Sequence, residues 1–208
     1  MFIPEKYPGR TAVLVATGPS LTEDVVLTLK KYKHLVVTFA CNDAFLRVPF
    51  LDEHYACDDK WWLMKGEEFR RRFPALNSWS QCPNEDIRNT YNLRFTPGKH
   101  APGVSLSRNL IHYGSNSGFQ MLNLALLMGC TKLLLVGYNM QRVESKAHFF
   151  GEHADGLTKV SPYPQFVKAY GTIQPEIKER IINCTPNSAL TMFKYMDLEE
   201  ALQSLTND

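Results

Sequence analysis

Two short runs of small and polar residues carry the clearest chemical signal in this chain. The first is ATGPSL at residues 16–21, and the second is SNSGFQ at residues 115–120. Each run leads into a stretch with helical spacing of apolar residues, so each is expected to start a helix. The first backbone N–H groups of a helix have no partner within the helix and favour an anion such as phosphate. Two such turns in one domain predict a site for a nucleotide or a sugar phosphate.

Polar side chains also follow several other apolar runs. We call these polar residues at the ends of expected strands the strand tips, and they are Asn42-Asp43, Asp58-Asp59, Asn139 and Thr185-Pro186-Asn187-Ser188. Ligands of parallel α/β sheets bind outside the carboxyl ends of the strands. We therefore expect the tips to converge with the two helix-starting turns on one cleft.

The elements that must position these tips alternate between strands and helices. Strands are expected at residues 11–16, 34–41, 53–57, 76–82, 93–96, 132–137 and 180–184. Helices are expected at residues 21–32, 61–72, 117–128, 164–174 and 197–205. The alternation predicts a three-layer α/β/α fold with a mostly parallel sheet. Residues 96–112 are expected to form a surface loop, and the polar, aperiodic residues 141–161 a mobile lid.

Length and composition limit the protein class. The chain has 208 residues, of which 44% are hydrophobic, enough for one domain with a sizeable core. A net charge of +2 is too small to indicate nucleic-acid binding. No run approaches the ~18 apolar residues of a membrane span, and the N-terminus lacks a signal-peptide pattern. The sequence leaves a homo-oligomer open. Cysteines without CxxC spacing are expected to be reduced, which indicates a cytoplasmic protein: Cys41, Cys57, Cys82, Cys130 and Cys184.

Five short motifs occur in order along almost the whole chain. They are ATGPSL at 16–21, CND at 41–43, NSG at 116–118, HFFGEH at 148–153 and CTPNSAL at 184–190. Together they resemble motifs of the family 42 bacterial sialyltransferases and of the related motility accessory factor and archaeal 6-hydroxymethylpterin diphosphokinase-like domains. A short single-domain chain of this kind is also similar to proteins carried in phage genomes.

The resemblance implies a single Rossmann-like domain that binds a CMP-activated sugar, needs no metal, and transfers the sugar to a hydroxyl of a glycan or another acceptor. It also implies that His153 is the general base, since histidine can accept a proton at neutral pH. Thr17 and Asp58 stand where the family has asparagine, and Gln141 stands at the first of two tyrosines that support the leaving phosphate. The residues expected to bind the nucleotide or the sugar are Thr17, Gly18, Pro19, Ser20, Asn42, Asp58, Asn116, Ser117, Gly118, Asn139, Gln141, Asn187 and Ser188.

Two other functions stay open. Asp43, Asp58 and Asp59 could place carboxylates beside phosphates, where Mg²⁺ prefers one or two carboxylates together with phosphate oxygens. That arrangement would suit phosphoryl or diphosphoryl transfer on a small molecule. The other alternative is a non-catalytic phage or cell-surface accessory protein that keeps the pocket for binding alone. The missing family tyrosines favour this alternative, and His153 opposes it.

Several of the same residues also have a purely structural explanation. Ser20 and Asn187 could cap helices that follow them. Trp61 and Trp62 are expected to be core or interface anchors rather than a platform for a stacked base. His148 is a second candidate for the base.

Overall fold

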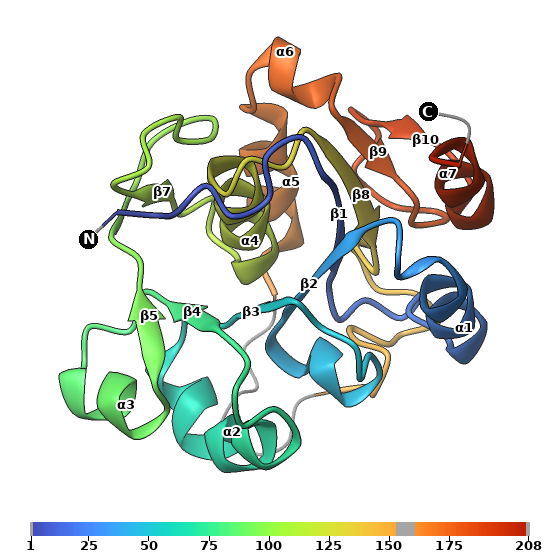
Figure 1. Cartoon of the computed structure of the whole chain (residues 1–208). Helices are drawn as coiled ribbons and strands as arrows, with labels where there is room; N and C mark the ends of the chain where they lie inside the picture. The colour runs from blue at the N-terminus through green and yellow to red at the C-terminus, as the bar shows by residue number, and fades with distance from the viewer. Residues whose placement is uncertain (1, 153–160, 207–208) are drawn as a thin grey trace.

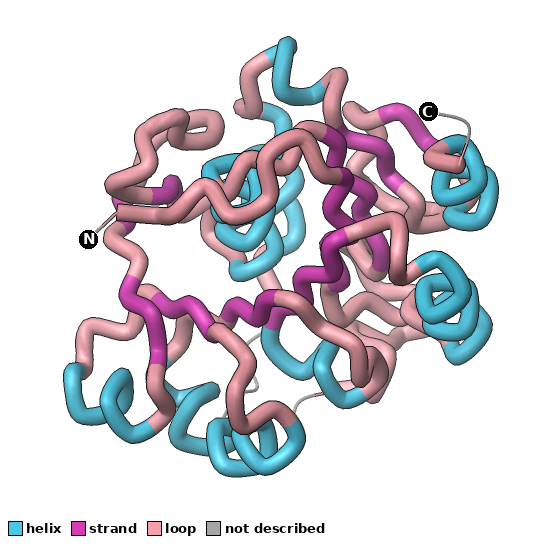
Figure 2. Tube along the Cα trace, in the orientation of Figure 1, coloured by secondary structure: helices cyan, strands magenta, loops and turns pink. Residues whose placement is uncertain are grey.

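A parallel β-sheet runs through the centre of the molecule, and helices cover both of its faces (Figure 1). The computed structural model describes residues 2–152 and 161–206. Within these residues the sheet has eight strands in the order β10-β9-β8-β1-β2-β3-β4-β5, and every pairing is parallel. Figure 2 shows the strands passing through the middle of the molecule with helices around them. The predicted α/β/α fold with a parallel sheet is confirmed.

The strands at the centre of the sheet are the most apolar. β1 (Thr11–Val15), β2 (Val37–Cys41) and β8 (Lys132–Val136) are nearly all buried, as expected for strands covered on both faces. β1 pairs with β2 on one side and β8 on the other, so the strand order reverses there. This is the switch point at which α/β sheets bind ligands. The other strands are β3 (Glu53–Tyr55), β4 (Ser78–Ser80), β5 (Leu93–Phe95), β9 (Ile181–Asn183) and β10 (Lys194–Tyr195), with β6 (Gly98–Lys99) and β7 (Ile111–His112) in a separate pair.

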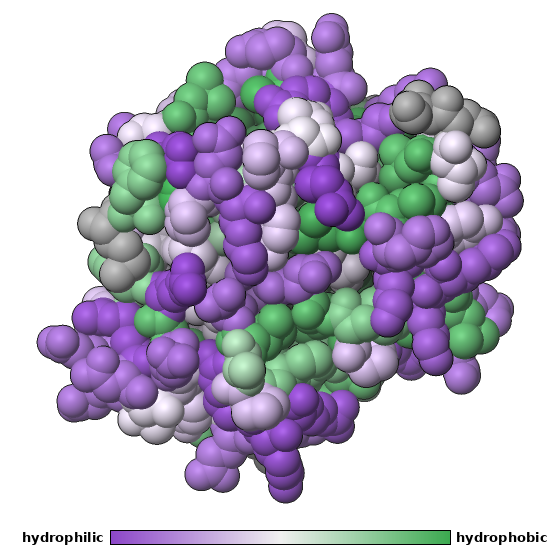
Figure 3. Space-filling model, viewed as in Figure 1, coloured by the Kyte–Doolittle hydropathy of each residue, from purple (hydrophilic) through white to green (hydrophobic). Residues whose placement is uncertain are grey.

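The helices bury opposite faces of β1. Helices α4 and α5 pack on the face that carries Ala12 and Leu14, whereas α1 and α7 pack on the face that carries Val13 and Val15. The helices are α1 (Glu23–Tyr32), α2 (Asp59–Arg72), α3 (Glu85–Thr90), α4 (Ser117–Leu127), α5 (Tyr163–Gly171), α6 (Pro175–Lys178) and α7 (Leu198–Ser204), with a 3₁₀ helix η1 (Asn42–Leu46). None of the described helices combines the length and apolar character needed to cross a membrane. The surface seen in Figure 3 is mainly hydrophilic, with hydrophobic residues in separate patches.

The first helix begins later than predicted. α1 starts at Glu23, and Thr22 is its N-cap, since the Thr22 side chain accepts a hydrogen bond from Val25 N at 3.4 Å. Ser20 is the cap expected from the sequence, but its hydroxyl instead donates a hydrogen bond to Asn139 Oδ1 at 2.7 Å. The polar run before α1 is therefore longer than a cap requires, and its first part belongs to the loop after β1.

Residues 96–112 were predicted as a surface loop, and this prediction is wrong. It contains β6 and β7, and residues inside it, such as Val104, are buried. Asn123 on α4 holds this segment: its Oδ1 accepts from Ser105 N and His112 N at 2.8 and 2.9 Å, and its Nδ2 donates to Ser105 O at 2.8 Å. Asn123 is fully buried among apolar residues of α4. These contacts join residues far apart in sequence, so local patterns could not show them.

An aromatic cluster joins η1 to α2. Trp61 and Trp62 are 2% and 0% exposed, which confirms that they belong to the core. The His54 ring lies 4.1 Å from the Phe69 ring, and its burial lowers the pKa of His54 to about 3. The imidazole of His54 is therefore neutral at physiological pH, and its Nε2 pairs with Asn42 O at 3.1 Å. This cluster fixes the backbone at the end of β2, where the cleft begins.

Candidate functional site

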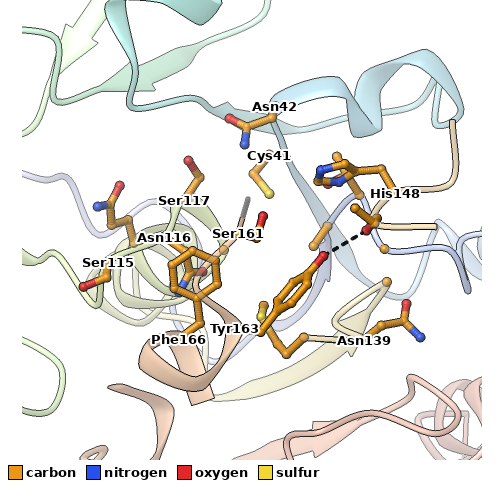
Figure 4. Close-up of a pocket in the computed structure, with 18 of the residues that line it drawn as sticks. Cys41, Asn42, Ser115, Asn116, Ser117, Asn139, His148, Ser161, Tyr163 and Phe166 are labelled. Carbon is orange, nitrogen blue, oxygen red and sulfur yellow. Dashed lines mark hydrogen bonds between the residues drawn. The ribbon is translucent and has the colours of Figure 1, made fainter. Parts of the chain in front are cut away.

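A cavity of about 270 Å³ lies at the carboxyl ends of β1, β2, β3 and β8 and at the first turn of α4. Residues of the loop after β1 and of the first turn of α4 line it, which confirms that these two predicted turns share one cleft; the predicted strand tip at residues 185–188 does not line it. Eight of the residues expected to bind a nucleotide or a sugar lie in its wall: Thr17, Gly18, Asn42, Asp58, Asn116, Ser117, Gly118 and Asn139. Figure 4 shows Asn42, Ser117 and His148 reaching this space from separate elements.

The loop after β1 packs backbone against backbone on the loop after β8. Gly18 N donates to Gly137 O at 2.9 Å, and a Cβ on Gly18 would lie 2.3 Å from both Gly137 O and Asn139 Oδ1. Gly137 has a φ of +76°, which favours glycine, and a Cβ there would lie 2.4 Å from Ala16 O. The close approach needs glycine at both positions. It brings the side chain of Asn139 against Ser20 N and Oγ at the cavity edge.

The first turn of α4 presents a positive helix end to the cavity. Asn116 is the N-cap, and its Oδ1 accepts from Phe119 N at 2.9 Å and from the Tyr170 hydroxyl at 3.1 Å. The first turn carries no acidic residue, so no carboxylate of the turn itself offsets the helix dipole. Ser117 and Gly118 line the cavity at this end. The geometry suits an anion between this turn and Gly18.

His148 contacts the turn after β1 directly. Its Nδ1 lies 2.8 Å from Thr17 Oγ1, and its ring stacks on Phe150 with centroids 5.0 Å apart. Phe149 N donates to Thr17 O at 2.9 Å, and the Arg47 guanidinium lies 4.7 Å from the centre of the Phe149 ring. The start of the expected lid therefore rests on the turn after β1. His153, the predicted base, lies outside the described residues.

Cys41, Cys57 and an aromatic wall complete the cavity, and none of them was predicted as a site residue from the sequence. Burial raises the pKa of Cys41 to about 12 and also raises the pKa of Cys57, so both thiols stay protonated at neutral pH and are poor nucleophiles. Tyr163 and Phe166, from the start of α5, face the cavity with Ser161 (Figure 4). The Tyr163 hydroxyl donates to Ala147 O at 3.4 Å.

The remaining predicted residues support the loops and do not line this cavity. Ser188 Oγ donates to Tyr138 O at 2.6 Å, and Gln141 Nε2 donates to Asn187 O. Asn187 has a φ of +53°, and a turn followed by β10 comes after it, so it caps no helix. Pro19 and Ser20 belong to the turn after β1 but also lie outside the cavity wall.

The three carboxylates considered as magnesium ligands do not form one group. Asp43 is buried and accepts a hydrogen bond from Trp61 Nε1 at 3.2 Å. Asp58 lines the cavity, and Asp59 is the first residue of α2. The described part of the chain contains no group of three His, Cys, Asp or Glu side chains that could hold a metal ion.

Comparisons with known proteins bear on the fold. No family model matches the chain, and no curated protein matches it either. Among solved structures, it is similar to a MAf glycosyltransferase from Magnetospirillum magneticum AMB-1, with a TM-score of 0.64 and 14% identity over 98% of this chain. The fold resembles that of a glycosyltransferase. The likeness covers 35% of that protein's length, so this chain spans about a third of it.

Proposed function

We propose that this chain binds a nucleotide sugar and transfers the sugar to an acceptor hydroxyl. The observation that carries the proposal is the meeting of the loop at Gly18 with the positive end of α4 in one cavity at the switch point of the sheet. The similarity of the fold to a glycosyltransferase supports the same reaction class.

The cavity would act on the leaving phosphate. In the reaction the acceptor oxygen bonds to the anomeric carbon of the sugar, and the bond from that carbon to the phosphate oxygen breaks with its electron pair on the phosphate. Negative charge then grows beside the α4 helix end, the Gly18 turn and His148. Fixed N–H dipoles at such a point lower the barrier because they need no rearrangement during the reaction.

The acceptor hydroxyl also needs a group that takes its proton. We propose one of the two histidines that follow β8 for this role. His153 is the prediction from the sequence. His148 is the histidine that the structure places in the cavity wall, and it is the alternative base.

The finer proposal is a CMP-activated donor that binds without metal. It rests on the five ordered motifs and on the single carboxylate, Asp58, among the described residues of the cavity wall. Calorimetry with CMP, UDP and GDP, each with a chelator and with Mg²⁺, tests it. CMP is expected to bind equally in both conditions, and the full chain is expected to release CMP from a CMP-sugar when an acceptor is present.

The other outcomes separate the remaining functions. Binding that requires Mg²⁺ and is lost in Asp58→Ala would contradict the metal-free transferase and favour phosphoryl or diphosphoryl transfer. Tight nucleotide binding without turnover for any acceptor would point to the accessory protein. No binding of any nucleotide would refute all three.

A further inference from the structure

A second groove adjoins the cavity along the same edge of the sheet. It has a volume of about 670 Å³ and lies where the chain leaves β3, β4, β5 and β7. Cys57 and Asp58 line both spaces, so the two are neighbours across these residues. Small-molecule sites usually measure ~300–1,000 Å³. At about 270 Å³ the first cavity lies below this range, so an acceptor would need the neighbouring groove.

The walls of the groove combine fixed aromatic rings with hydrogen-bonding groups. Phe95 is held by the Arg88 guanidinium, 4.8 Å from its ring centre, and the Tyr113 ring lies edge-on to His100 with centroids 4.6 Å apart. Asp58, Asp59 and Gln81 supply carboxylates and an amide. These contacts hold both rings in place before any ligand binds.

Gln81 carries an amide group that needs a partner. Its Nε2 is buried and makes no hydrogen bond with any described residue. A Cβ on Gly98 would lie 2.0 Å from Gln81 Nε2 and 2.5 Å from Tyr113 Cε1, so the glycine lets the amide and the ring share this part of the groove. Buried polar groups are almost always hydrogen-bonded. A ligand oxygen in the groove would supply the partner that this donor lacks.

We infer that this groove is the acceptor subsite, that it takes a neutral saccharide, and that Asp58 holds the sugar at the junction with the cavity through a hydroxyl beside the attacking one. The inference rests on the proposed function. A sugar matches the groove because its hydroxyls donate to carboxylates, its oxygens accept from an amide, and its C–H face packs on the electron-rich face of an aromatic ring. The groove is lined by two carboxylates, Asp58 and Asp59, and by one ammonium group, Lys60, so its net negative charge disfavours an anionic acceptor.

Asp58 would act on the acceptor by positioning it. A hydroxyl beside the attacking one donates a hydrogen bond to the Asp58 carboxylate, which holds the sugar so that a lone pair of the attacking oxygen faces the anomeric carbon in the neighbouring cavity. The new bond forms from the attacking oxygen, the sugar–phosphate bond breaks onto the phosphate, and the proton of the attacking hydroxyl, which Asp58 does not hold, passes to the histidine base of the proposed function.

Binding of the saccharide can be tested apart from binding of the nucleotide. The full chain, labelled with ¹⁵N, is titrated with neutral methyl glycosides of hexoses and N-acetylhexosamines at millimolar concentration, and separately with CMP. We expect at least one glycoside to shift the amides of Gln81, Gly98 and Tyr113. Tyr113→Ala and Gln81→Ala should each weaken that glycoside by about tenfold, which corresponds to about 1.4 kcal/mol, and should leave CMP affinity unchanged.

Tyr195→Ala serves as the matched control, since Tyr195 is exposed on β10, at the opposite end of the strand order from β5. Glycoside binding that is equal in wild type and both groove variants would overturn the inference. The inference would also be overturned if the groove bound only an acidic sugar, or if it bound a serine peptide and none of the glycosides. Glycoside binding at the groove in a chain that binds no nucleotide would refute the proposed function while the saccharide site stands.

A kinetic measurement tests the role of Asp58. In a transfer assay with the glycoside that binds, Asp58→Ala is expected to raise the acceptor KM by about tenfold or more, because a hydrogen bond to a charged group is lost. The donor KM should change far less. Glu67→Gln is the control, since Glu67 is an exposed carboxylate on α2, the helix that follows Asp58. An unchanged acceptor KM in Asp58→Ala would refute the assigned role.

Discussion

Replacing Gly18 with alanine should force apart the loops that follow β1 and β8. The new Cβ would lie 2.3 Å from Gly137 O and from Asn139 Oδ1, and 2.9 Å from Gly137 C, and two of these three atoms belong to backbone that cannot rotate away. Overpacking costs about 1–3 kcal/mol, and loss of the Gly18 N to Gly137 O bond costs about 1 kcal/mol more. The free energy of unfolding should therefore fall by about 2–4 kcal/mol.

Urea unfolding with a constant m-value measures this change, and calorimetry with CMP measures its effect on the site. Because Gly18 lines the cavity, nucleotide affinity should fall by about tenfold or more. Gly171→Ala is the matched control: a Cβ there meets nothing within 4 Å, so stability should change by less than about 1 kcal/mol. If Gly18→Ala kept both the wild-type midpoint and the wild-type affinity, the close packing of the two loops would not shape the site.

Three further predictions concern a base, a buried amide and a buried histidine. His153→Ala should leave nucleotide affinity nearly intact and slow transfer by ~10²–10⁴-fold, with exposed His34→Ala as control; full activity would assign the base to His148. Asn123→Ala removes three hydrogen bonds and should lower the free energy of unfolding, measured with urea, by about 3 kcal/mol. Asn109 is exposed, so Asn109→Ala should change it very little. An equal loss in both variants would show that Asn123 does not hold residues 96–112 in place. The folded pKa of His54 is about 3, so below pH ~6.5 the unfolded chain binds a proton that the folded chain does not. The free energy of unfolding should therefore be full above pH ~6.5 and about 2 kcal/mol lower at pH 5. The His54→Phe variant should lose this part of the pH dependence.

The fold could be predicted because its main elements carry strong local patterns. The buried runs around Val13, Phe39 and Leu134 and the apolar helix after Ser117 fix the central strands and α4 without reference to other segments. α3, α6, β6, β7 and β10 are short, between two and six residues, and too brief for a period to show. Their positions depend on distant contacts such as those of Asn123.

The candidate site was predicted where the backbone determines it. The turns at Gly18 and Ser117 follow from strand ends meeting at one edge of a parallel sheet. The aromatic wall could not be foreseen, because Tyr163 and Phe166 reach the cavity only through the packing of α5. The environment of Asp43 has a related origin: the sequence shows that a carboxylate follows β2, but not that it accepts a hydrogen bond from Trp61.

The most direct test of the central claim is an amide titration of the ¹⁵N-labelled chain with CMP in the presence of a chelator. We expect the largest shifts at the backbone amides of Gly18, Ser117 and Gly118, because these residues line the cavity. Saturation with no shift at these three amides, or with the largest shifts at the far ends of β1 and β8, would contradict the claim.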